Sequence, residues 1–142
     1  MRVTLLAIMV GLSALAVLFL VLSSLSYRRF RGAVPEIRSS DDLTRLRSQA
    51  TLQMYLSLPA HPALTLGGVA VVWLLGWLYF GVLGWLDLLL YGVLPIVVVS
   101  VVASLEESPA ERSKEMKVAD PSLNPERDRI VDVWINRLLP KW

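Results

Sequence analysis

The stretch from Leu64 to Leu105 constrains the fold most, because it is a long apolar run with a single charged side chain, Asp87. A water-soluble domain of this size needs polar residues on its surface and could not bury such a run. As one straight helix the run would be about 60 Å long, twice the ~30 Å hydrocarbon core of a bilayer. We therefore expect a break at Gly81–Gly84, between two transmembrane helices at about 64–82 and 86–104.

A second apolar run, from Val3 to Leu25, is long enough to span a bilayer. A cleaved signal peptide is the alternative, because Arg2 leads the run and Ala14–Ala16 imitates a cleavage site. The run is longer than the apolar core of an ordinary signal peptide, and it ends in the basic residues Tyr27–Arg31. We therefore interpret residues 1–26 as a retained transmembrane anchor.

Composition supports the same class of protein. The chain has 142 residues, of which 55% are hydrophobic, and a positive mean hydropathy. We therefore expect an all-α integral membrane protein with three transmembrane helices, an N-terminal anchor and a tight hairpin at 63–105. A net charge of +2 is too small to suggest a nucleic-acid partner, and the absence of cysteine excludes disulfides and thiolate metal sites.

The segment 27–62 is predicted to be a cytoplasmic linker that contains an amphipathic helix at 40–57. Ser39 and Asp42 have the spacing of a capping box at the start of this helix. Its apolar residues recur at steps of three and four and form one stripe: Leu43, Leu46, Ala50 and Met54.

The tail 106–142 is charged and is predicted to end in an amphipathic helix at 125–139. Ile130, Trp134 and Leu138 share its broad apolar arc, and charges of both signs lie opposite. A helix that lies on lipid usually has a polar face rich in Lys and Arg. We therefore expect this helix to dock on a partner subunit, with Trp134 as its anchor.

The distribution of basic residues predicts the orientation. Six arginines lie between residues 26 and 63 and seven Arg or Lys follow residue 105, whereas the hairpin turn has none. The positive-inside rule then places the N-terminus and the turn outside and both polar segments in the cytoplasm. The expected location is a bacterial inner membrane or an equivalent energy-transducing membrane.

Small residues are expected to hold the spans together, because helices in lipid gain little from apolar contact alone. Gly67, Gly76 and Gly92 are the predicted packing positions. We expect Gly76 and Gly92 to meet at mid-depth, one on each arm of the hairpin.

Three arginines, Arg28, Arg29 and Arg31, follow directly after the first span. Such a cluster attracts anionic lipid headgroups, so we expect lipids among the ligands of this chain. An equally good interpretation is that the cluster serves only as the topology signal.

Two ionisable residues are candidates for function within or beside the hairpin. Asp87 is a candidate ion site, but we favour a helix-capping role at the start of the third span and expect no base of this chain near enough to pair with it. An arginine from another subunit is a third alternative. His61 is a weak candidate ligand for haem or a pigment, and an interfacial loop residue is the favoured interpretation.

No catalytic or metal-binding arrangement is recognisable in the sequence, because its single histidine has no nearby nucleophile. We expect a chain that is not an enzyme and has no cofactor or metal of its own; contact with a pigment or haem held by a partner subunit stays open. The favoured function is a non-catalytic accessory, structural or assembly subunit of a larger integral-membrane complex. The alternatives are a small oligomeric channel or transporter that uses Asp87, and a membrane-surface adaptor.

Overall fold

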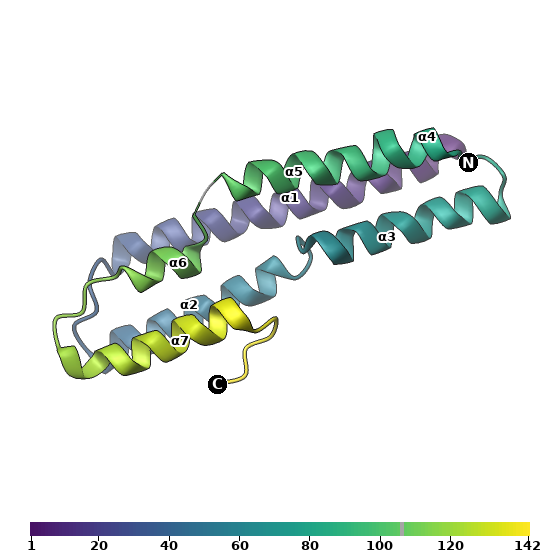
Figure 1. The fold of residues 1–142 in the computed structure, drawn as a ribbon. Coiled ribbons are helices and arrows are strands. Elements are labelled where there is room, and N and C mark those ends of the chain that lie inside the picture. The colour runs from purple at the N-terminus through teal and green to yellow at the C-terminus, as the bar shows by residue number, and fades with distance from the viewer. Residues whose placement is uncertain (106) are drawn as a thin grey trace. The chain divides into compact units, whose positions relative to one another are not determined.

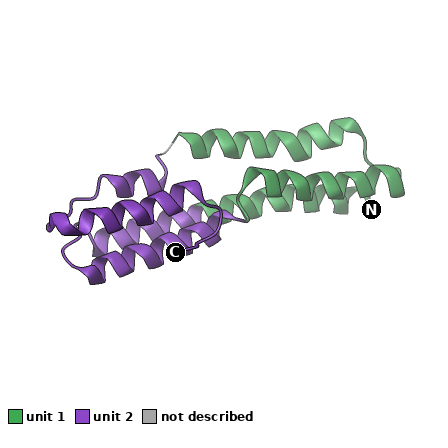
Figure 2. Ribbon diagram, turned by 60° about the horizontal axis from the view of Figure 1, so that its bottom comes forward, with its two compact units in different colours: residues 1–20, 59–106 green, residues 21–58, 107–142 purple. Residues whose placement is uncertain are grey.

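The computed structural model describes residues 1–105 and 107–142, and within these ranges 78% of residues are helical and no strand occurs (Figure 1). Three helical stretches are long and apolar enough to cross a membrane: Arg2–Ala33, Ser40–Tyr79 and the one that begins at Trp85. The predicted all-α class with three helices of spanning length is therefore confirmed. The chain forms two compact units (Figure 2): Met1–Leu20 with Pro59–Glu106 is unit 1, and Val21–Leu58 with Glu107–Trp142 is unit 2.

Unit 1 is built from three apolar helical segments. Two of them contain a short π-helical stretch, in which each backbone bond spans one residue more than in an α-helix. Its elements are the first part of α1 (Arg2–Ala33), α3 (Pro62–Leu74), η1 (Leu75–Tyr79), α4 (Trp85–Leu88), η2 (Leu89–Val93) and α5 (Leu94–Ser104).

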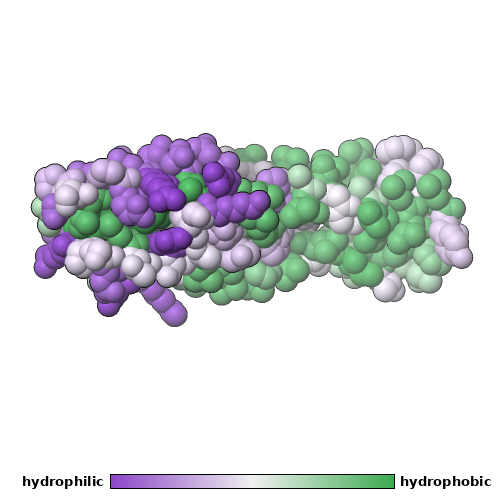
Figure 3. All heavy atoms as spheres, turned by 90° about the horizontal axis from the view of Figure 1, so that it is seen from below, coloured by the Kyte–Doolittle hydropathy of each residue, from purple (hydrophilic) through white to green (hydrophobic). Residues whose placement is uncertain are grey.

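The inner faces of these segments form one apolar core. Its buried residues are Leu5, Met9, Val69, Trp73, Leu83 and Ile96. Many leucines and valines on the outward faces are about half exposed, and the side seen in Figure 3 is largely green, that is apolar, over unit 1. An apolar exterior of this kind suits contact with lipid tails rather than water.

The hairpin turn falls at the predicted place. Helical structure stops after Tyr79 and resumes at Trp85, and Gly81 adopts the left-handed region with φ of 62°. The N–H groups of Val82 and Leu83 both donate to the carbonyl of Gly76, at 2.9 and 3.3 Å. The turn therefore satisfies part of its own backbone hydrogen-bonding capacity.

Close packing of glycines occurs, but not between the two that were expected to meet. A Cβ on Gly92 would lie 2.6 Å from Cγ1 of Val69 and 3.1 Å from Cε of Met9. Gly76 packs against Leu83 beside the turn, so the expected contact between Gly76 and Gly92 is wrong. Gly67 has no atom within 4 Å of its Cβ position and faces open space.

Unit 2 is a bundle of amphipathic helices around a second core. Its elements are the end of α1, α2 (Ser40–Ser57), α6 (Pro109–Lys114), η3 (Pro121–Leu123) and α7 (Asn124–Asn136). The core consists of Val34, Ile37, Leu43, Leu46, Ala50, Met116 and Ile130.

Two predicted helix ends need correction. Ser39 does not cap α2 with its side chain; instead the Asp42 carboxylate reaches one residue further and accepts the N–H of Arg38 at 2.9 Å. The C-terminal helix stops at Asn136 rather than at residue 139, because Arg137 is extended, with φ of −122° and ψ of 143°.

A matched pair of glycine substitutions tests the packing of unit 1. Gly92→Ala places a methyl group against the stiff side chain of Val69 and should lower stability by about 1–3 kcal/mol through overpacking. Gly67→Ala should leave stability unchanged or raise it slightly, because the helix propensity of alanine is about 1 kcal/mol more favourable than that of glycine. Thermal unfolding in one detergent measures both, and equal effects would contradict the packing described.

A second pair tests the core of unit 2. Ile130 is 2% exposed and Leu138 is 57% exposed. Ile130→Ala should lower the stability of this unit by about 2–5 kcal/mol, as truncation in a core does. Leu138→Ala should change it by less than about 0.5 kcal/mol. Denaturant unfolding followed by circular dichroism separates the two, and a stable Ile130→Ala variant would show that α7 does not hold the bundle.

Candidate functional site

Asp87 is buried at the start of α4, and its two oxygens have different partners within unit 1. Oδ2 accepts the backbone N–H of Gly84 at 2.8 Å, which is the capping contact predicted from its position. Oδ1 accepts Nη2 of Arg2 at 2.9 Å. The carbonyl of Gly84 in turn accepts the indole N–H of Trp73 at 2.9 Å.

The partner of Asp87 corrects the expectation that no base of this chain would be near it. Arg2 is far away in the sequence, but the first and third spans both begin at the same end of unit 1 (Figure 1). A three-span topology brings these two positions to the same end of the unit. The predicted fold therefore already implied that Arg2 could reach Asp87. The side chain of Arg2 is 61% exposed and that of Asp87 is 8% exposed. The pair therefore joins a solvent-exposed arginine to a buried aspartate.

His61 lies at the N-terminus of α3 and is exposed. Its Nδ1 accepts the backbone N–H of Ala63 at 3.3 Å, and Pro62 occupies the first helical position. Within the described residues, no group of three His, Cys, Asp or Glu side chains could hold a metal ion. The contacts of His61 are therefore those of a helix cap.

The residues predicted to dock on a partner are mostly used within unit 2. Ile130 belongs to the core, and Trp134 packs against that core with its ring edge-on to Tyr27 at 6.3 Å between centroids. The apolar arc of α7 covers α2 and α6 of its own chain, so Trp134 and Ile130 are not a free docking surface. Leu138 lies beyond the end of α7 and is exposed.

Unit 2 instead has an open groove with an apolar lining between the end of α1 and α2, here called the α1–α2 groove. It has a volume of about 700 Å³. Leu22, Leu25 and Leu52 line it and are 44%, 49% and 45% exposed. Its other lining residues are Ser26, Arg29, Phe30, Ala33, Val34, Thr44, Arg45, Ser48, Gln49 and Leu56.

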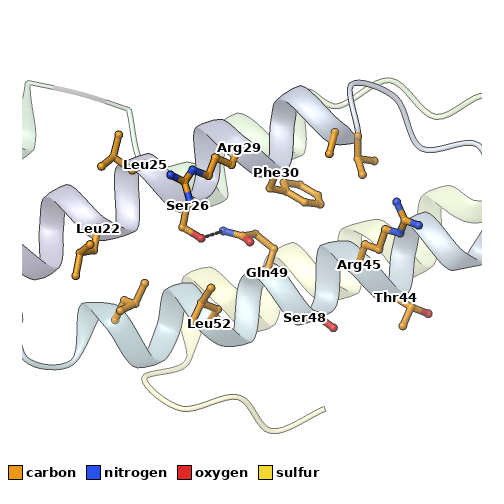
Figure 4. A pocket seen from close by; sticks show the side chains of 13 residues that line it. Leu22, Leu25, Ser26, Arg29, Phe30, Thr44, Arg45, Ser48, Gln49 and Leu52 are labelled. Carbon is orange, nitrogen blue, oxygen red and sulfur yellow. Dashed lines mark hydrogen bonds between the residues drawn. The ribbon is translucent and has the colours of Figure 1, made fainter.

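One hydrogen bond crosses the α1–α2 groove. Nε2 of Gln49 donates to Oγ of Ser26 at 3.0 Å, and Figure 4 shows Leu22 on one side of this bond with Phe30 and Arg45 on the other. The groove therefore combines an apolar part with arginine side chains. Sequence reasoning missed it, because the α2 stripe was read for its buried face and not for the leucine beside that face.

The three arginines after the first span point to two different places. Arg29 lines the α1–α2 groove together with Arg45. Arg28 and Arg31 line a separate hollow with Arg112 of α6. The sequence predicted one cluster of three, and the helical rotation of 100° per residue explains why the structure divides it.

The ion pair of unit 1 gives a directional test. Arg2→Gln leaves the buried Asp87 carboxylate without its charged partner and should lower the thermal stability of the chain in detergent. The double variant Arg2→Gln/Asp87→Asn should recover most of that loss, because no buried charge then remains unpaired. If the double variant is less stable than Arg2→Gln alone, the pair does not serve to neutralise Asp87.

No protein-family model matches the chain, and no curated protein or solved structure shows significant similarity to it, so the residues described above carry what is proposed of its function.

Proposed function

We propose that this chain is a non-catalytic accessory or assembly subunit of a larger integral-membrane complex, and that the α1–α2 groove receives an amphipathic helix of a partner subunit. The observation that carries the proposal is the groove itself, an apolar surface left open on a folded bundle. Exposed leucines that are gathered in one groove mark an interaction site more often than scattered ones do.

The chemistry of the groove indicates the kind of helix it receives. Arg29 and Arg45 lie among its lining residues, so a helix with acidic residues beside its apolar stripe is complementary in charge. From Thr44 to Leu56 the α2 side of the groove is about 18 Å long at a rise of ~1.5 Å per residue, which suits a partner helix of about three turns.

The orientation is part of the same proposal. The positive-inside rule places the arginine-rich segments of unit 2 on the cytoplasmic side of a bacterial inner membrane or an equivalent membrane. Leu22 and Leu25 belong to the end of the first apolar run, so this end of the groove lies where the span reaches the membrane surface. The partner is then an integral subunit with a cytoplasmic helix, or one whose span continues into a cytoplasmic helix.

The channel alternative is less well supported by the contacts of Asp87. An ion path needs a carboxylate that can exchange its partners, whereas both oxygens of Asp87 are engaged by Arg2 and Gly84. The same contacts suit a residue that closes one end of a three-helix unit. A structural role for Asp87 is consistent with an accessory subunit.

Two substitutions on α2 test the groove. Leu52 lines it, whereas Tyr55 is exposed on the same helix outside it. Leu52→Gln should reduce recovery of partner subunits about tenfold in mild detergent, because burial of a leucine contributes about 1.5–3 kcal/mol. Tyr55→Gln is the control and should retain them. Mass spectrometry of the co-purified chains gives the ratio, and circular dichroism checks that both variants stay folded.

A photo-crosslinking amino acid at position 52 identifies what occupies the groove. The proposal requires a crosslink to an amphipathic helix of another subunit that carries acidic residues. A crosslink to a second copy of this chain or to lipid, or equal loss of partners in both variants, would overturn it.

A further inference from the structure

We propose that Arg28 and Arg31 of α1 and Arg112 of α6 form a binding site for the phosphate of an anionic phospholipid headgroup, a site independent of the docking groove. The three side chains line one hollow of about 380 Å³, together with Tyr27 and Glu115. They come from segments far apart in the sequence, so the folding of unit 2 creates the cluster.

A buried hydrogen bond fixes the two helices that carry these arginines. Tyr27 is 3% exposed, and its hydroxyl lies 3.2 Å from Oγ of the fully buried Ser113. Ser113 Oγ donates to the carbonyl of Pro109 at 2.8 Å, so its hydrogen is in use and Tyr27 is the donor of the pair. This contact holds α6 against α1 and keeps Arg112 beside Arg28.

The arginines of the hollow lack a charged partner. Among the described residues, none of the three forms a salt bridge, and Glu115, which lines the same hollow, pairs with none of them. With three arginines and one glutamate the lining of the hollow carries a net positive charge, which a bound anion balances. Nη1 of Arg31 also donates to the carbonyl of Pro35 at 3.4 Å, a neutral acceptor that leaves this charge in place. The planar guanidinium fork matches the oxygens of a phosphate group, which makes phosphate the best-fitting anion.

The sequence positions of the arginines favour a lipid as the source of that phosphate. Arg28 and Arg31 follow the apolar run that ends at Leu25, and Arg112 follows the run that ends at Leu105. Residues just past the end of a span lie at the level of the headgroups. Anionic lipids of the cytoplasmic leaflet attract basic side chains at that level.

The structure also supplies the control. A simple topology signal, or diffuse attraction to a charged surface, depends on the number of arginines and not on their arrangement. Arg29 is adjacent to Arg28 in the sequence, but it lines the α1–α2 groove with Arg45. Removal of two charges from the hollow can therefore be compared with removal of two charges from the groove.

The experiment is a titration of the purified full chain in an uncharged detergent with phosphatidylglycerol, followed by native mass spectrometry, with phosphatidylcholine as the neutral reference. We expect the chain to bind phosphatidylglycerol in preference. Arg28→Gln/Arg112→Gln should weaken that binding about tenfold or more, and Arg29→Gln/Arg45→Gln should weaken it less than about twofold. Tyr27→Phe, which keeps every charge, should give an intermediate loss if the hydroxyl contact positions Arg112.

Each contrary outcome overturns a defined part of the proposal. Equal weakening by the two double variants would show diffuse attraction and no site. Equal binding of the two lipids would show no recognition of the anionic headgroup. Displacement of the lipid by millimolar inorganic phosphate, with equally tight binding of that phosphate, would show a site for the free anion rather than for lipid.

Discussion

The hydrogen bonding of the hairpin turn is the constraint on which unit 1 depends. A turn between two helices leaves backbone groups that no regular helix satisfies, so these groups need other partners. Here the Gly76 carbonyl accepts two N–H groups of the turn, Asp87 accepts the N–H of Gly84, and Trp73 donates to the Gly84 carbonyl. Because Asp87 also binds Arg2, the same set of hydrogen bonds connects the start of α1 to the turn. One polar cluster thus holds the three apolar helices together at one end.

Unit 2 is stabilised in a different way from unit 1, because its helices are amphipathic and each buries one apolar face. The stripe of α2 and the arc of α7 cover each other around Leu46 and Ile130. These two faces are buried in the core. The side of α2 that faces the end of α1 stays exposed, and Leu52 lies on it. A surface left over after a core has formed is a better indication of partner contact than an apolar arc taken from a helical wheel.

The sequence predicted the elements well and their mutual contacts poorly. The length and composition of the apolar runs fixed three helices and a break near Gly81, since a bilayer admits few alternatives. The helix at 40–57 followed from local periodicity. The burial of Trp134 depends on which faces meet in space, and no single-sequence pattern encodes that. The pair of Arg2 and Asp87 was implied by the three-span topology, which puts both residues at one end of unit 1, although no base of the chain was expected near Asp87. The candidate site was found only in part, because Arg112 joins Arg28 through the fold and not through the sequence.

The two π-helical segments have a consequence for how this hairpin tolerates change in length. Each of them, Leu75–Tyr79 and Leu89–Val93, holds one residue more than an α-helix would need for the same rise. Deletion of a single residue there converts the segment into ordinary α-helix and leaves the following side chains of that arm on the same faces. Deletion of one residue elsewhere in the arm rotates every following side chain by about 100°. The hairpin therefore contains two places where the loss of one codon is tolerated without repacking of the arm, with Gly76 and Gly92 each inside one of them.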